Sequence, residues 1–334
     1  MIISYEFALF KLIAAPWISW SIYVFVKLGV VELLSKEAMD FRKIAEVVKA
    51  DPDALYRVLQ GLARTGLLLE ISPGTFALTK LGECLKAGAP GGLRSWALLW
   101  GEEFHHAWSG LLASVQTGTT AFDSVYGANL FQYLQENQET ARTFDDAMGG
   151  LAELIYPAVV AAYDFSAIGQ LVDVGGGRGT LIASILAANP NLKGMLFDQP
   201  DVVGKASTVL EAYGVADRCE IAAGNFFEAV PAGADAYVLS NIIHDWDDER
   251  AAAILHNCRR AIAEHGKILI VETVLSGKNE PALARVNDLN MLVLTGGRER
   301  TEDEFSKLLA CSGFELKRVL PVQPMTCVVE AVPV

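Results

Sequence analysis

One histidine of this chain, His244, stands where it could remove a proton from a substrate. It follows a short apolar run, Ala236 to Leu239, which predicts a buried strand. The ligands of open α/β sheets bind beyond the carboxyl ends of such strands. The other histidines fall on predicted helices or at their ends. Because an imidazole with a pKa of about 6.5 can take a proton from a hydroxyl group near neutral pH, His244 is a candidate general base.

Two glutamates from other parts of the chain could orient that imidazole. Glu272 ends a predicted strand that begins at Lys267, and Glu299 lies in the segment GGRERT. Either carboxylate could accept the second imidazole N–H, fix the tautomer and stabilise the imidazolium. Each could equally be an ordinary solvated glutamate, because the sequence alone does not show which side chains meet.

A glycine-rich turn could cradle a cofactor. The residues 171–180 read LVDVGGGRGT, an apolar strand that runs into the turn, and the apolar helical run Leu181 to Ala188 follows at once. The alternating glycines Gly175, Gly177 and Gly179 allow a sharp turn and leave no Cβ where a ligand must approach. The start of the helix offers unpaired N–H groups to that ligand.

The spacing of these glycines indicates which cofactor binds. Dinucleotide sites follow G-x-G-x-x-G/A, but here Thr180 or Ile182 falls at the third glycine position. The G-x-G-x-G pattern resembles the first motif of S-adenosylmethionine (SAM) methyltransferases. Asp198 ends the next predicted strand, Gly194 to Phe197, about 20 residues further on, where it could accept hydrogen bonds from both ribose hydroxyls. NAD would use the same acid, so Asp198 alone does not discriminate.

Apolar runs of strand and helix length alternate from Leu171 onward and predict a doubly wound parallel sheet. The predicted elements are Leu171–Val174, Leu181–Ala188, Met195–Phe197, Val202–Tyr213, Cys219–Ala222, Ala236–Leu239, Glu249–Glu264 and Lys267–Glu272. Nearer the N-terminus, two helices, Phe41 to Lys49 and Ala54 to Thr65, precede a hairpin of Leu67 to Ile71 and Thr75 to Leu78, which together predict a winged helix-turn-helix.

The composition restricts the partners of this chain. Its 334 residues suffice for two domains, and its net charge of −13 argues against nucleic acid. The winged segment from Lys36 to Lys86 holds eight basic and seven acidic residues, so it lacks a basic face for DNA. The five cysteines are scattered, which favours reduced thiols in a cytoplasm, and no cluster has the spacing of metal ligands, so we expect no metal.

The apolar run Phe7 to Val26 approaches the length of a membrane span, but it contains Lys11 and Pro16. A helix at a membrane and a helix buried between two subunits are the alternatives, and we favour burial between subunits because nothing downstream resembles a membrane segment. The following stretch, Trp96 to Ala162, is helical in pattern and rich in aromatic residues. It could wall a pocket for a flat, apolar substrate, with Met148 either lining that pocket or filling the core.

A series of motifs in this chain resembles one enzyme family. VDVGGGRGTL, FDQPDVV, GNFFEAVP, HDWDDE, the strand-end Glu272 and GGRERT occur in that order, after the N-terminal segment DPDALYRVLQGLARTGLL. They resemble the plant-type and bacterial secondary-metabolite O-methyltransferases, the caffeic acid and hydroxyindole O-methyltransferase family. The resemblance covers nearly the whole chain.

The resemblance implies a fold and a division into domains. The fold would be α/β, with a Rossmann-like SAM-binding domain after an all-helical dimerisation domain of the winged-helix type, whose hairpin is the wing. The domains would be residues 1–95 for dimerisation, 96–165 for the helical linker that walls the substrate pocket, and 166–334 for SAM binding. An intertwined homodimer would account for the apolar N-terminal helix.

The resemblance also implies a set of site residues and a reaction. SAM would donate its methyl group to a hydroxyl of a small aromatic or polyketide-like acceptor. The implied catalytic residues are the base His244 with Glu272 and Glu299. The implied cofactor residues are Asp173, Gly175, Gly177, Asp198, Gln199, Asn225, Phe226 and Ser240. The implied acceptor residues are Phe144, Met148, Asn241 and Met291.

Three residues depart from the plant members of that family. Asn225 replaces an aspartate that faces the adenine, and Ser240 replaces a lysine near the carboxylate end of SAM. Asn241 replaces a tryptophan, so we expect a different acceptor. Two alternatives stay open: a family member that binds SAM but catalyses hydroxylation or decarboxylation, and a non-catalytic SAM-binding or DNA-binding regulator. The presence of His244 and both glutamates argues against them.

Overall fold

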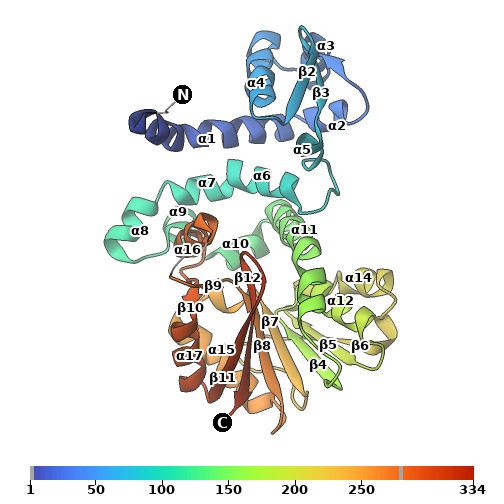
Figure 1. Cartoon of the computed structure of the whole chain (residues 1–334), viewed down its shortest axis with the longest axis vertical. Coiled ribbons are helices and arrows are strands. Elements are labelled where there is room, and N and C mark those ends of the chain that lie inside the picture. Colours follow the sequence, from blue (N-terminus) through green and yellow to red (C-terminus); the bar gives the residue numbers. More distant parts are fainter. Residues whose placement is uncertain (1–3, 278–280) are drawn as a thin grey trace. The chain divides into compact units, whose positions relative to one another are not determined.

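A computed structural model describes residues 4–277 and 281–334 of the chain. The chain divides into two compact units (Figure 1), one of residues 1–109 and 131–151 and the other of residues 110–130 and 152–334. The segment 96–165, predicted as a separate linker, is divided between both units. The boundary at residue 151 falls within the helix α11 (Gln138–Ala162).

The first unit contains the predicted winged helix. Helices α3 (Phe41–Val48) and α4 (Pro52–Arg64) precede the hairpin of β2 (Leu68–Ser72) and β3 (Thr75–Leu78). The short strand β1 (Met39–Asp40) pairs with β3, so this unit holds a three-stranded antiparallel sheet beside its helices. Asp40 and Asp51 cap the two helices, because their side chains accept the main-chain N–H groups of Arg42 and Ala54. The unit also contains α1 (Tyr5–Lys27), α2 (Val30–Leu34), α5 (Lys80–Glu83), α6 (Leu93–Gly101), α7 (Glu103–Trp108) and α10 (Leu130–Glu136).

Helix α1 is the apolar N-terminal run, and most of its large side chains face outward. Only Phe25 and Val26, at its end, are buried, whereas Phe10, Ile13 and Trp17 are at least half exposed. Its length and composition would allow it to cross a membrane, which is true of no other helix in the described part of the chain. A row of exposed apolar side chains on this scale marks a surface that a partner or a membrane covers.

The second unit is built on a seven-stranded sheet in the order β11-β12-β8-β7-β4-β5-β6. The strands are β4 (Gln170–Val174), β5 (Lys193–Asp198), β6 (Cys219–Ala223), β7 (Ala236–Ser240), β8 (Lys267–Glu272), β11 (Phe314–Gln323) and β12 (Thr326–Pro333). Five neighbouring strands are parallel, in the order β8, β7, β4, β5 and β6. Strand β12 pairs with β8 in the antiparallel direction. The strand order reverses between β4 and β7, and ligands bind at such a switch point in open α/β sheets.

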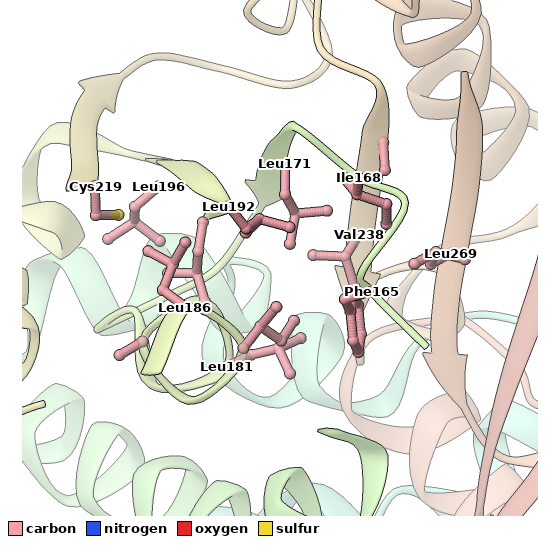
Figure 2. Close-up of a cluster of buried hydrophobic side chains, with 14 of the residues drawn as sticks. Phe165, Ile168, Leu171, Leu181, Leu186, Leu192, Leu196, Cys219, Val238 and Leu269 are labelled. Atoms are coloured by element: carbon pink, nitrogen blue, oxygen red, sulfur yellow. The ribbon is translucent and has the colours of Figure 1, made fainter. Parts of the chain in front are cut away.

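Helices cover both faces of this sheet (Figure 1). Helices α12 (Thr180–Ala188) and α14 (Ala206–Ala212) lie on one face, and α15 (Asp248–Ala261) and α17 (Glu302–Cys311) lie on the other. Figure 2 shows the core under α12, where Leu181 and Leu186 pack against strand residues such as Leu171 and Leu196. A second hydrophobic core lies on the other face of the sheet. Leu171 of β4 packs in the first core and Val172 in the second, because the side chains of a strand alternate between its faces.

The second unit also contains several further elements outside the sheet and its covering helices. They are α8 (Leu111–Thr117), α9 (Ala121–Tyr126), α13 (Pro200–Val203), the 3₁₀ turns η1 (Ala216–Arg218) and η2 (Ile243–Asp245), β9 (Val274–Leu275), α16 (Ala282–Leu294) and β10 (Arg300–Thr301). The single helix predicted over residues 202–213 is two helices, because Gly204 ends α13 before α14 begins. Strands β9 to β12 follow Glu272, in a part of the chain where no strand was predicted.

Candidate active site

The structure brings His244 and Glu299 together within the second unit. His244 lies in the turn η2, directly after strand β7, and Glu299 immediately precedes β10. The imidazole Nδ1 is 3.0 Å from Glu299 Oε1, and the Glu299 side chain is fully buried. A carboxylate in this position holds the proton on Nδ1 and leaves Nε2 to accept one from a substrate.

Of the two glutamates that could have met the imidazole, Glu272 binds the main chain beside it. Its Oε1 accepts the main-chain N–H groups of Ile242, Ile243 and His244, at 3.1, 2.6 and 3.1 Å. The carboxylate therefore holds the backbone of the turn that carries His244 and leaves the ring to Glu299. Glu272 is almost fully buried at the end of β8, so these three donors replace the water that it loses.

The segment GGRERT holds the same turn from the other side. Arg298 donates its main-chain N–H to the carbonyl of His244 at 2.8 Å, and a Cβ on Gly297 would collide with that carbonyl. The buried guanidinium of Arg300 donates to the carbonyls of Ile243 and Trp246, at 3.0 and 2.9 Å. The turn is thus bound along its main chain on both sides of His244.

Several acids around His244 set its charge in the cofactor-free protein. Burial lowers the pKa of this imidazole, but attraction from Glu299, Asp245 and Glu272 outweighs burial and raises the pKa to about 10. Burial raises the pKa of Glu272 to about 7 and that of Asp245 to about 6. These acids therefore favour the protonated imidazole, and His244 acts as a base only after it has lost that proton.

The glycine-rich turn lies beside the His244 turn in the same unit. Gly175, Gly177 and Gly179 have φ values of 71°, 60° and 82°, which favour glycine. A Cβ on Gly175 would meet the side chains of Ile242 and Phe226, whereas a Cβ on Gly177 would enter open space. Gly175 is therefore needed for packing, and Gly177 leaves a space beside the turn.

Asp198, the predicted ribose ligand, supports the glycine turn. Its Oδ2 accepts the N–H of Gly177 at 2.8 Å, and its Oδ1 accepts the N–H of Gln199 at 2.6 Å. Asp198 therefore holds the turn through both of its carboxylate oxygens.

Two buried polar side chains lack protein partners at the ends of the central strands. Asp173 of β4 is fully buried, and neither of its carboxylate oxygens has a hydrogen-bond partner among the residues that the structure describes. The Ser240 hydroxyl at the end of β7 also has none in that part of the chain. Burial and the Asp198 charge raise the pKa of Asp173 to about 7, and burial raises the pKa of the neighbouring Tyr156 to about 12. Such unpaired groups are costly unless a ligand binds them.

The remaining predicted residues occupy several places. Asn225 is exposed, and its Oδ1 accepts the N–H of Phe227 in the loop after β6. Asn241 has a φ of 53°, a left-handed conformation that is rare for a residue other than glycine. Met291 is buried on α16 in the second unit, whereas Phe144 and Met148 lie on the part of α11 that belongs to the first unit. The glycine turn, the His244 turn and Asn241 all belong to the second unit.

A model of the O-methyltransferase domain matches residues 108–315 of the chain. The chain belongs to the O-methyltransferase family. A second model, of the O-methyltransferase dimerisation domain, matches residues 10–88, which include most of α1 and the winged helix. The resemblance read from the motifs is therefore confirmed.

This methyltransferase is similar to several known proteins along its whole length. It is 44% identical to the phenazine O-methyltransferase PhzM of Lysobacter antibioticus over 326 residues, which cover 98% of this chain and 96% of the relative. The crystal structure of LaPhzM matches with a TM-score of 0.95 and 43% identity, over 99% of this chain and all of that one. The structure of NcsB1, an O-methyltransferase from neocarzinostatin biosynthesis, was solved with SAM and 2-hydroxy-5-methyl naphthoic acid. It matches with a TM-score of 0.83 and 31% identity, over 95% of this chain and 96% of that one.

The cofactor of this family is SAM, and the residues of the second unit fit it. The unpaired carboxylate of Asp173 and the unpaired hydroxyl of Ser240 suit the charged amino-acid end of SAM. Asp198 suits the ribose, and the open side of Gly177 leaves room for the body of the molecule. The replacement of a lysine by Ser240 thus leaves a polar group in place, beside Tyr156.

Sequence reasoning missed several residues that build this methyltransferase site. Arg300 was quoted only within a motif, although it is buried and its guanidinium binds the main chain of the His244 turn. Tyr156 was noted only as an aromatic residue of the helical stretch. Asn287 and Asp288 of α16, which bind Glu299, were not identified at all. The local sequence offered no signal for them, because Arg298 and Arg300 stand alike on either side of Glu299 and only Arg300 is buried.

Proposed function

We propose that this protein transfers the methyl group of SAM to a hydroxyl of a small, planar aromatic or polyketide-like acceptor, with His244 as the general base. The observation that carries the proposal is the His244–Glu299 pair at the carboxyl ends of the parallel strands, in the same unit as the glycine turn. That pair is what removal of a hydroxyl proton requires. A protein that only bound SAM would need no such pair.

The residues of the chain divide the work of this reaction. SAM supplies an activated methyl group when bound. Glu299 keeps the Nδ1 proton in place, so that His244 presents Nε2 to the acceptor hydroxyl, and Glu272 fixes the turn beneath it. A general base typically raises the rate of such a reaction by about 10²- to 10⁴-fold. Placement of the two reactants can lower the activation barrier further, by about 7–11 kcal/mol.

The charge on His244 links cofactor binding to this chemistry. The surrounding carboxylates raise the pKa of His244 and so favour a proton on its imidazole. SAM brings positive charge into the same unit, and a neighbouring positive charge lowers the pKa of an imidazolium. We therefore expect His244 to release its proton when the cofactor binds, which prepares Nε2 to act as a base.

The acceptor class follows from the relatives and from the residues of the site. One relative is named for a phenazine, and another was crystallised with a naphthoic acid; both molecules are planar and aromatic. Met291 of this chain is buried near the carboxyl end of α16, where a thioether can pack against an aromatic ring. We propose that Met291 and Asn241, which both belong to the second unit, contact such an acceptor.

The exposed α1 supports a proposal on assembly. The matched dimerisation model begins at residue 10, within this helix, and the most apolar window of α1 is only 11% buried in the single chain. We propose that a second copy of the chain covers α1 in a homodimer, in preference to a membrane. The scattered cysteines, all free thiols in the structure, support a cytoplasmic location.

The experiment that tests the proposed function has two steps. In calorimetric titration, the protein should bind S-adenosylhomocysteine and should not bind NAD. The Asp198→Ala variant should lose the binding of S-adenosylhomocysteine. Hydroxylated phenazines and naphthoic acids are then incubated with the enzyme and SAM carrying a labelled methyl group. Label on the acceptor oxygen is the expected result. Binding of S-adenosylhomocysteine without methyl transfer to any hydroxyl, or with hydroxylation or decarboxylation of the acceptor, would overturn it.

A further inference from the structure

The carboxylate that holds the catalytic histidine is itself held by α16. Asn287 donates its side-chain Nδ2 to Glu299 Oε1 at 2.7 Å, and the adjacent Asp288 accepts the main-chain N–H of Glu299 at 2.9 Å. Helix α16 thus binds both the side chain and the backbone of Glu299. Neither Asn287 nor Asp288 belongs to a motif that identified the family.

The hydrogen bond from Asn287 shares its acceptor atom with His244. Both Asn287 Nδ2 and His244 Nδ1 lie against Oε1, whereas Oε2 is buried and has no hydrogen-bond partner within the described ranges. All direct hydrogen bonding of this carboxylate therefore falls on one oxygen. Because the Asn287 amide does not ionise, it donates this hydrogen bond and orients the carboxylate whatever the charge on His244.

Sharing an oxygen also changes how strongly Glu299 attracts the imidazolium. A donor on a carboxylate oxygen stabilises the negative charge and reduces what that oxygen offers to a second donor. The other groups that face the pair are Asp245, whose Oδ1 lies 3.8 Å from His244 Nε2, and Glu272 beneath the turn. Arg300 donates to main-chain carbonyls on either side of His244, and Asp288 receives a main-chain N–H. Asn287 is the side-chain amide that contacts the carboxylate itself.

We propose that Asn287 is a positioning residue for methyl transfer: it fixes the Glu299 carboxylate toward His244 and weakens the hold of that carboxylate on the imidazole proton. The inference rests on the proposed function, because it requires His244 to give up its proton and act as a base. Asn287 acts through Glu299 and need not touch the acceptor or the cofactor.

The test is a double-mutant cycle of Asn287→Leu and Glu299→Gln, with Asn191→Leu as a control in the exposed turn before β5. Leucine has nearly the volume of asparagine but cannot donate a hydrogen bond. The titration of His244 is followed by NMR in the cofactor-free proteins, and kcat is measured against pH at saturating SAM. Because the NMR readout needs no acceptor, it tests Asn287 even if methyl transfer fails.

We expect Asn287→Leu to raise the pKa of His244 by about one unit, as loss of one charge-assisted hydrogen bond predicts. The acid limb of the kcat profile should move to higher pH by a similar amount, with a loss of about tenfold near neutral pH. In the Glu299→Gln background, Asn287→Leu should move neither the titration nor the profile. The control should leave both unchanged.

Two results would overturn the inference. One is an unchanged His244 titration in Asn287→Leu. The other is the same loss of kcat at every pH, in both the parent and the Glu299→Gln background, which would mean that Asn287 only stabilises α16. If the NMR shift appears as expected but no acceptor is methylated, the positioning of Glu299 stands and the proposed function is the part that fails.

Discussion

Glu272 binds the main-chain N–H of His244 at 3.1 Å, while the ring of the same histidine binds Glu299. The two carboxylates therefore do separate work on one residue. Glu272 shapes the turn that places the imidazole, and Glu299 sets the tautomer and the charge of its ring. A substitution at either position should lower activity, but for different physical reasons that experiments can separate.

Replacement of Glu272 by alanine should mainly destabilise the protein. Glu272→Ala leaves three main-chain N–H groups without an acceptor, that of Ile243 buried and the other two partly buried. A buried group left in this way costs about 1–3 kcal/mol, and a partly buried one costs less. For a unit of this size, each kcal/mol lowers Tm by roughly 2–4 °C, so we expect Tm to fall by at least about 5 °C. Calorimetry of the cofactor-free protein measures this shift.

Glu272→Gln is the matched control, because its side-chain carbonyl can still accept these hydrogen bonds. It should lose much less stability than the alanine variant. Burial raises the pKa of Glu272 to about 7, so the neutral glutamine resembles a form that the native side chain already reaches near neutral pH. Equal Tm values for the two variants would show that the three hydrogen bonds do not stabilise the turn.

Gly177→Ala should weaken cofactor binding far more than it weakens the fold. The backbone at Gly177 has a φ of 60°, which costs an alanine about 1 kcal/mol, and nothing lies within 4 Å of the added methyl group. That open space is where we place the cofactor. We expect the affinity for S-adenosylhomocysteine to fall at least about tenfold, which corresponds to 1.4 kcal/mol.

Gly214→Ala provides the comparison for this prediction. Gly214 has a φ of 67° in the turn after α14, and a Cβ there also has nothing within 4 Å. The two variants should therefore lose similar stability, but only Gly177→Ala should lose affinity in calorimetric titration. Similar affinities in both variants would place the cofactor away from Gly177.

The strands and the glycine turn were predictable because local patterns determine them. The apolar run before Gly175 predicts β4 within one residue, and the acidic residue that ends the next strand is Asp198 as expected. The partners of His244 were harder to predict, because they come from segments far along the chain. Sequence reasoning allowed either Glu272 or Glu299 to meet the imidazole, and only the three-dimensional fold distinguishes their roles.

The residues that sequence reasoning missed act through contacts that leave no local pattern. Nothing in the sequence distinguishes Asn287 from other polar residues, and only the fold of α16 brings its side chain to Glu299. Arg300 alternates with charged neighbours, and nothing in that spacing shows that it is buried while Arg298 is partly exposed. The pairing of β11 with β12 and of β12 with β8 likewise depends on long-range contacts that the sequence analysis did not identify.

Glu299→Gln should widen the pH range of activity on the acid side while it lowers the maximum. The Glu299 charge attracts the imidazolium, so its loss lowers the pKa of His244. The base is then free of its proton at lower pH, and the acid limb of kcat at saturating SAM should move down. The maximum should fall because glutamine stabilises the imidazolium less during proton transfer. An acid limb that stays in place would mean that another group controls it.

His244→Gln should change the pH dependence of stability as well as abolish most activity. The folded protein raises the pKa of His244 to about 10, above the unfolded value of about 6.5. The stabilisation from the protonated ring is thus fully present below about pH 6.5 and is lost as pH rises through the folded pKa. Between pH 8 and 10, where Glu272 and Asp245 are already ionised, the cofactor-free parent should lose stability faster than His244→Gln.

Urea unfolding of the cofactor-free parent and of His244→Gln at several pH values measures this difference. Tyrosine, lysine and cysteine residues also titrate toward the alkaline end of the window, but they are common to both proteins and cancel in the comparison. Parallel stability curves would show that His244 is neutral in the cofactor-free protein. The base would then be ready before the cofactor binds, and the expected release of a proton on cofactor binding would not occur.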